Sequence, residues 1–288
     1  MARTAAGRGS LMSSPEHRLR KKYWSSGNSL AAFWIPGMIL VGIIALALLV
    51  IAVPVFQNPG YLAGAASDPM VFQAFFVTFL AGFCAVGILA ITGTPLAYAL
   101  SRSDTPWKGI VETLVDIPLV LPHTVAGLMV YLLFMSRGLL GAPFGGIGLT
   151  FEDAFPGIVA AMVFVAIPYY VNAVREGFGR VPVQLENVAR SLGASRARAF
   201  ITVSLPLTTR HILYGALLAW GRAIGEFAAV IMIAYFPVVI STLIYYRFNT
   251  GGIAESQAIA FILILLCLVL FFVFRFLTRR AGVYDDRS

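Results

Sequence analysis

The chain has 288 residues, of which 59% are hydrophobic and 12% charged, with a mean hydropathy of +0.85. Soluble domains are about half apolar and about a quarter charged, so this composition excludes both a water-soluble globule and a disordered chain. The formal net charge of +8 does not indicate a nucleic-acid partner, because the cations cluster between apolar stretches, as they do in proteins that face anionic cytoplasmic lipid.

Six stretches are long enough to span a membrane, which requires about 20 mainly apolar residues. Their apolar runs are continuous rather than alternating, which indicates helices and not barrel strands. They cover residues 34–56, 72–99, 110–135, 157–174, 212–236 and 257–277. We therefore expect an all-α integral membrane protein with one six-helix domain over 34–277. Residues 1–33 should form a basic cytoplasmic tail, disordered and attracted to anionic lipid, and residues 278–288 a second cytoplasmic tail.

Lysine and arginine are divided unevenly between the two sides that six spans would create. Of the 21 such residues, eighteen fall in the N-terminal tail, in the segments 100–109 and 175–211, and in the C-terminal end from Arg275 onward. Two fall in the segments 136–156 and 237–256, and one, Arg222, falls within the fifth span. Because cytoplasmic segments are enriched in cations, we expect both termini in the cytoplasm of a multi-pass cell-membrane protein.

The motifs of catalytic and nucleotide-binding sites are missing from the sequence. It contains no HExxH, GxSxG or calcium-loop pattern, so neither an enzyme active site nor a metal site is expected. It also lacks a GxxxxGK[ST] loop, so it cannot hold ATP phosphates in that way, and no cofactor is expected on this chain. If the protein moves a solute at the expense of ATP, a separate subunit must bind the ATP.

The longest polar stretch between spans predicts a cytoplasmic helical loop over residues 180–206. Three apolar residues recur along it at helical spacing, namely Leu185, Val188 and Leu192. Gly193 follows as a helix terminator, and Arg196 begins a second polar helical piece that ends at Leu205 and Pro206. Periodicity alone leaves two interpretations open: a rigid knob on the cytoplasmic side, or an amphipathic connector lying on the lipid surface.

The residues of this loop resemble the coupling loop of ABC importer permeases, whose pattern is roughly E-A-A-x-x-x-G followed by I-x-L-P. The resemblance and its immediate surroundings involve Glu186, Asn187, Val188, Ala189, Gly193, Ala194, Leu205 and Pro206. Asn187 and Val188 stand where the family has Glu and Ala, so a carboxylate's role at the first position does not carry over. In the family this loop docks in a cleft of the ATPase subunit, and the resemblance implies that these residues couple this chain to such a subunit.

Segments within the spans are similar to molybdate and tungstate permeases, most of all to archaeal-type members. Residues 117–127, IPLVLPHTVAG, resemble their third span, and residues 221–230, GRAIGEFAAV, resemble their fifth span. The resemblance implies a type I ABC importer permease fold and a subunit that forms the path for a tetrahedral oxyanion. It also implies the partners: a second copy of this chain, two cytoplasmic ABC ATPase subunits that hydrolyse the ATP, and an extracellular oxyanion-binding protein.

Arg222 and Glu226 are two charged residues near the middle of the fifth span. They lie four positions apart and therefore share one helix face. A charge at that depth is disfavoured by about 2.5–3.5 kcal/mol, and mutual pairing lowers this penalty. Either the pair locks helices together, or Arg222 attracts the oxyanion while Glu226 holds the arginine in place. We favour the structural pair, because a neutralised arginine attracts an anion weakly.

Four further residues are candidates for the pathway or for core packing: His123, Thr124, Gly221 and Gly225. His123 either donates to an anion or bonds a backbone carbonyl freed by the preceding proline, and we favour the backbone bond. Threonine hydroxyls such as that of Thr124 usually bond their own helix. Gly221, Gly225 and Ala229 form a small-residue ridge that permits close helix approach, either at a dimer seam or within one subunit.

Alternative functions stay open at this point. A sulfate-type oxyanion ABC permease would share the same motifs, and the binding protein rather than this chain would select among the anions. An ATP-independent secondary transporter or channel for an inorganic anion would be built from repeated halves with discontinuous helices, and the sequence contains no convincing internal repeat. A membrane scaffold would show no flux at all.

Reporter fusions test the expected orientation. A reporter that works only in the cytoplasm should be active after residue 288 and inactive within residues 136–156, because the cations gather on the cytoplasmic side. A fusion at residue 288 that is active only outside the cell would contradict the six-span arrangement.

Overall fold

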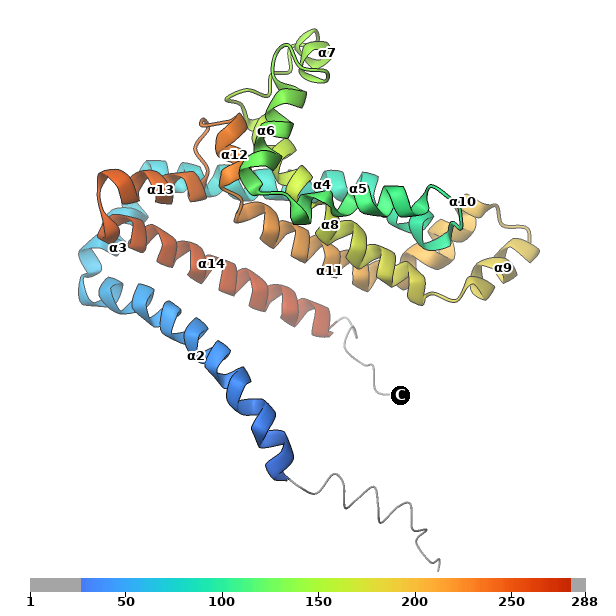
Figure 1. Cartoon of the computed structure of the whole chain (residues 1–288), viewed down its shortest axis with the longest axis horizontal. Helices are drawn as coiled ribbons and strands as arrows, with labels where there is room; N and C mark the ends of the chain where they lie inside the picture. Colours follow the sequence, from blue (N-terminus) through green and yellow to red (C-terminus); the bar gives the residue numbers. More distant parts are fainter. Residues whose placement is uncertain (1–26, 281–288) are drawn as a thin grey trace, which may run out of the picture. The chain divides into compact units, whose positions relative to one another are not determined.

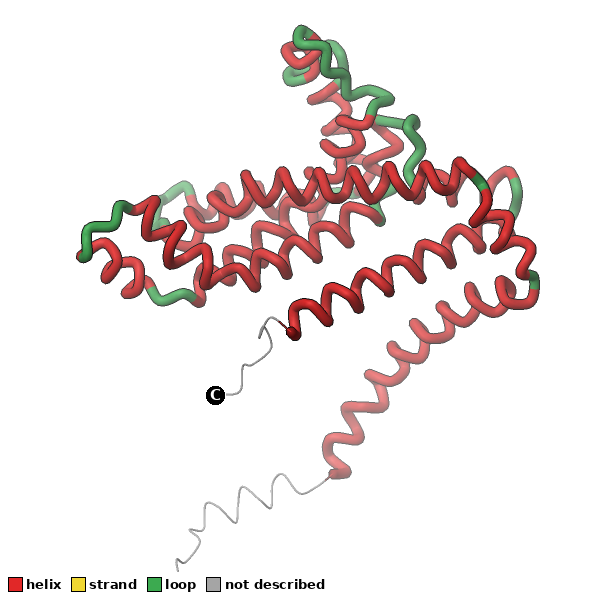
Figure 2. The backbone as a smooth tube through the Cα atoms, turned by 180° about the vertical axis from the view of Figure 1, so that it is seen from behind, coloured by secondary structure: helices red, strands yellow, loops and turns green. Residues whose placement is uncertain are grey.

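The computed structural model describes residues 27–280, and the regular elements in that range are all helical (Figure 2). The chain divides into two compact units, residues 1–57 and 58–288. The described part of the first unit is α2 (Gly27–Gln57), which begins inside the stretch expected to be a tail. The rest of that tail, residues 1–26, and most of the C-terminal tail, residues 281–288, lie outside the described residues.

The second unit is a succession of helices joined by short connections. In chain order they are α3 (Pro59–Ser67), α4 (Pro69–Arg102), α5 (Lys108–Val120), α6 (His123–Phe134), α7 (Gly141–Gly145), α8 (Phe155–Arg180), α9 (Val183–Ser191), α10 (Arg196–Ala199), the π-helix η1 (Phe200–Ser204), α11 (Leu205–Ile224), α12 (Ala228–Ile233), α13 (Ile240–Thr250) and α14 (Ile253–Arg280).

Four helices of the described chain are long and apolar enough to cross a bilayer: α2, α4, α8 and α14. The pair α5 and α6 meets the same requirement jointly, although the two are bent by 117° at their junction, and it would make a fifth span. The stretch expected as the fifth span, 212–236, is instead divided between α11 and the short α12. The chain is therefore a multi-pass membrane protein, whereas the count of six spans stays a prediction.

Both breaks have local causes. At the first, Leu121 is extended, with ψ 139°, because the following Pro122 disfavours the helical conformation for the residue before it. At the second, α11 ends at Ile224 with Gly225 after it, and the side chain of Glu226 accepts a hydrogen bond from the Ala229 N–H at 2.7 Å, which satisfies one of the free N–H groups in the first turn of α12. Non-helical backbone at membrane depth requires such internal partners.

Helix α8 lies at the centre of the second unit, packed against α4, α11, α5, α6 and α12. Figure 1 shows α4, α8 and α11 running side by side. The buried face of α8 includes Met162, Tyr170 and Phe178. Helices α6 and α12 approach so closely that a Cβ on Gly127 would lie 2.7 Å from the Ala229 Cα. Polar side chains add specific links between α8 and its neighbours: Thr94 with Tyr170 at 2.8 Å, Glu112 with Arg175 at 2.6 Å and Asp116 with Asn172 at 2.7 Å.

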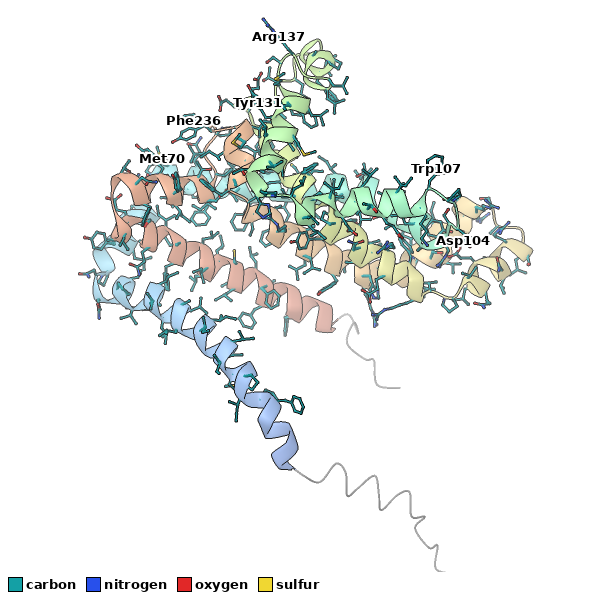
Figure 3. The ribbon with its side chains drawn as sticks, in the orientation of Figure 1. Met70, Asp104, Trp107, Tyr131, Arg137 and Phe236 are labelled. Carbon is teal, nitrogen blue, oxygen red and sulfur yellow. The ribbon has the colours of Figure 1, made fainter. Side chains whose placement is uncertain are left out.

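The loops that the cation count assigns to one side also lie together in space. Asp104 and Trp107, from the connection before α5, lie toward the end of the unit that carries α9 and α10 (Figure 3). Met70 and Phe236 lie toward the opposite end (Figure 3). There Arg247 joins α13 to the start of α4 through Asp68, at 2.6 Å. This grouping agrees with the expected sidedness, and the orientation in the membrane stays a prediction.

Candidate functional site

The loop between α8 and α11 folds as a compact knob of helix, turn and helix. Helix α9 is followed by Gly193, whose φ of +94° lies in the left-handed region that favours glycine. The Ser195 side chain then caps α10 by accepting from the Arg198 N–H at 3.2 Å, and η1 leads directly into α11. The expected helix, glycine turn and second helical piece are thus confirmed.

The apolar stripe of α9 points away from the protein rather than into it. Leu185, Val188 and Leu192 are 45%, 58% and 84% exposed. Among the other residues that resemble the coupling loop, Asn187, Gly193 and Pro206 are exposed, while Ala189, Ala194 and Leu205 are half-buried. An apolar stripe on a loop between long helices that the subunit itself leaves uncovered is a surface suited to a protein partner.

The buried side chain of α9 is Glu186, and its carboxylate is held by three residues from two other elements, α4 and η1. Its Oε1 accepts from Arg102 Nε at 2.9 Å, from Arg102 Nη2 at 2.7 Å and from Ser204 Oγ at 2.7 Å. Its Oε2 accepts from the Tyr98 hydroxyl at 2.9 Å. We call Tyr98, Arg102, Glu186 and Ser204 the Glu186 cluster. The carboxylate of Glu186 is directed into this chain, so only the backbone and the neighbouring side chains of α9 remain for direct contact with a partner.

Glu186 stays ionised in this setting. Burial alone would raise the pKa of its carboxyl, but hydrogen bonds from Arg102, Ser204 and Tyr98 outweigh burial and hold the pKa below its ordinary value. Arg102 and Ser204 did not emerge from the sequence as site residues, since each lies on a different element and no fixed spacing links them to Glu186. The one signal that the sequence offered for Arg102 was its position as a cation at the expected cytoplasmic end of a predicted span.

A second polar cluster lies where the two helix breaks meet. Arg222 Nη2 lies 2.6 Å from Glu226 Oε2, and 3.0 Å and 3.2 Å from the two ring nitrogens of His123. We call these three residues the Arg222 cluster. Because α6 begins at His123 and the Glu226 carboxylate accepts from the first turn of α12, the cluster joins the starts of α6 and α12 to the end of α11. The expected pairing of Arg222 with Glu226 is present.

His123 differs from the favoured expectation. Its ring contacts Arg222, whereas the sequence suggested a bond to a backbone carbonyl, because the break at Pro122 turns the ring toward α11 instead of along its own helix. Its side chain is 51% exposed, compared with 17% for Arg222 and 2% for Glu226. Thr124, one residue further along α6, is also exposed.

The small-residue ridge is interrupted by the second break. Gly221 and Gly225 are exposed, and a Cβ on Gly221 would have no atom within 4 Å. Ala229 lies beyond the break and packs against Gly127 instead. The two glycines and His123 therefore form an open face of the described subunit, and a histidine at membrane depth requires water or protein rather than lipid tails beside it.

Comparison with known proteins places this arrangement in a family. Residues 91–283 match the model described as "Binding-protein-dependent transport system inner membrane component". The chain is 39% identical to the molybdate/tungstate transport system permease protein WtpB of Thermococcus kodakarensis over 85% of this chain and 94% of that protein. It is 36% identical to the protein of the same name from Pyrococcus abyssi, over 85% of this chain and 94% of that one.

A solved structure shares the fold. A chain in the crystal structure of a bacterial alginate ABC transporter in complex with an alginate pentasaccharide-bound periplasmic protein matches with a TM-score of 0.67. The match covers 92% of this chain and 97% of that chain at 19% sequence identity. The helices described above thus have the fold of ABC importer membrane subunits.

Substitutions at the Arg222 cluster test whether the ion pair is structural. Arg222→Met or Glu226→Gln alone should destabilise the purified protein by about 3–5 kcal/mol, because each leaves a buried charge without its partner. The double substitution should destabilise it less than either single one, as measured by thermal unfolding in detergent. Glu176→Gln, which breaks the exposed pair with Arg180, is the control and should change stability by less than about 1 kcal/mol. A double variant as unstable as the worse single variant would contradict a structural pair.

Proposed function

Because the chain belongs to the family of binding-protein-dependent transport system inner membrane components, we propose that it is the permease subunit of an ATP-driven importer for molybdate or tungstate. The observation that carries this proposal is its similarity to relatives named as molybdate/tungstate permeases along nearly their whole length. The chain is not an enzyme: it forms the translocation path, and ATP hydrolysis takes place in a separate subunit.

The proposed assembly contains two copies of this chain, two cytoplasmic ABC ATPase subunits and an extracellular oxyanion-binding protein. The outward apolar stripe of α9 supports docking of an ATPase on the knob, because exposed apolar side chains on a cytoplasmic loop gain from burial against a partner. The open face with Gly221, Gly225 and His123 supports a second copy and a watery passage beside it. Six spans with both termini in the cytoplasm complete this proposal.

The Arg222 cluster has a divided role in this proposal. The buried pair of Arg222 and Glu226 holds α11 and α12 against α6, while the exposed His123 and Thr124 border the passage. A tetrahedral dianion entering an apolar path loses much of its hydration, so strong selection is better made by many donors in a soluble receptor. The membrane subunit then supplies a passage that binds the anion weakly and opens to alternate sides.

Reconstitution tests the proposed function against its alternatives. Proteoliposomes that contain this chain and its ATPase, with the binding protein on the opposite face, should accumulate tungsten from tungstate only when ATP is present on the ATPase side. Excess molybdate should compete, and excess sulfate should compete far less. Equal competition by sulfate would favour the sulfate-type permease. Accumulation without the ATPase would favour a secondary transporter, and no flux under any condition would favour a scaffold.

The turn at Gly193 provides a separate test of ATPase docking. Gly193→Asp should lower co-purification of the ATPase while membrane insertion is retained, because a side chain is strained at a φ of +94° and reshapes the knob. Gly179→Asp is the matched control: it adds the same side chain and charge to α8, where a Cβ meets open space. Gly193→Asp protein that binds the ATPase at the wild-type yield would count against docking at the knob.

A further inference from the structure

The Glu186 cluster lies between the proposed docking surface and the membrane helices. Helix α9 presents its apolar stripe outward and packs mainly against α10 and η1. Its inward side chain, Glu186, is 7% exposed and reaches the end of one long helix, α4, and the end of η1. A force applied to α9 by a docked partner therefore reaches the bundle through this carboxylate as well as through the chain.

Arg102, at the end of α4, also connects Glu186 to the end of α8. It lies in the last turn of α4, and its side chain is 14% exposed. While Nε and Nη2 bind Glu186, Nη1 donates to the Phe178 carbonyl at 2.9 Å and Nη2 to the Val181 carbonyl at 3.0 Å. One planar guanidinium thus fixes the end of α4, the end of α8 and α9 in a single geometry, which a lysine could not reproduce.

Tyr98 and Ser204 extend the contact to the base of α11. Tyr98 lies one turn before Arg102, and its ring packs against Phe178 and Phe200 with centroids 5.3 Å and 4.7 Å away. Ser204 is fully buried at the end of η1, immediately before α11 begins at Leu205. A single π-helical turn is a local irregularity that recurs at functional positions in helices. These contacts link α9 both to α4 and to the base of α11.

We infer that the Glu186 cluster is the element that converts movement of α9 into movement of α4, α8 and α11, so that Arg102 and Glu186 set how much anion is carried for each ATP hydrolysed. This inference rests on the proposed function. Arg102 and Glu186 are positioning residues: they touch neither the anion nor ATP. A buried ion pair can transmit movement in this way because its hydrogen bonds are directional and multidentate. The two side chains therefore either keep one relative arrangement or separate.

The test is the ratio of tungstate transported to ATP hydrolysed in proteoliposomes of the complete complex. Glu186→Gln, which keeps the shape but removes the charge, and Arg102→Lys, which keeps the charge but removes the fork, should each lower this ratio about five-fold. The amount of ATPase bound to the purified complex should stay at the wild-type level. Glu176→Gln, which breaks the exposed ion pair with Arg180 on α8, is the matched control and should leave the ratio unchanged.

The outcomes separate this inference from a purely structural role. If transport and ATP hydrolysis fall in the same proportion, so that the ratio is unchanged, the inference is wrong. If the charge variants fail to assemble, Tyr98→Phe and Ser204→Ala each remove one hydroxyl while sparing the ion pair, and a wild-type ratio in both would likewise overturn it. A wild-type complex that moves no tungstate with ATP contradicts the proposed function itself, whereas an active wild type with unaltered variant ratios contradicts only this inference.

Discussion

Charges that leave water must find their partners inside the protein, and this constraint organises both the Glu186 cluster and the Arg222 cluster. Glu186 and Glu226 are the two acidic residues buried within the described range, and each is paired with an arginine at 2.6–2.7 Å. Each also stands where the course of the helices changes, Glu186 at the knob and Glu226 at the second break. The ion pairs therefore hold the irregular parts of an otherwise regular helical bundle.

The same constraint explains why the surfaces of the chain are inverted relative to those of a soluble protein. On α9 the acidic side chain points inward and the apolar side chains point outward, because the inside offers an arginine and the outside is left for the proposed partner. On α11 the small and polar residues remain open, because a passage or a second copy, rather than lipid, is their proposed neighbour. The exposure of a side chain in the subunit is thus more informative about its proposed neighbour than the hydropathy of the residue.

The sequence predicted the helical class, most of the long apolar helices and the helix-turn-helix knob, since these follow from hydropathy, periodicity and one glycine. The pairing of Arg222 with Glu226 was also accessible, because a spacing of four places two residues on one helix face. The bend of 117° between α5 and α6 could not be predicted from the sequence, because the apolar run continues through Pro122 although the helix is broken there. Arg102 and Glu186 lie far apart in the chain and on different helices, so only the folded structure brings them together.

The pairing of Arg222 also bears on the energetics of the proposed transport. A free guanidinium beside the passage would hold a dianion strongly, and a strongly held anion leaves slowly, whereas conduction requires weak sites. Glu226 neutralises Arg222, so the anion meets a region of low net charge with His123 and Thr124 at its edge. A passage of this kind neither selects nor concentrates its substrate. In the proposed assembly, selection then belongs to a soluble receptor, and the free energy for accumulation arrives from ATP through the knob and the Glu186 cluster. On this proposal the rigidity of that cluster is as important for transport as the passage itself.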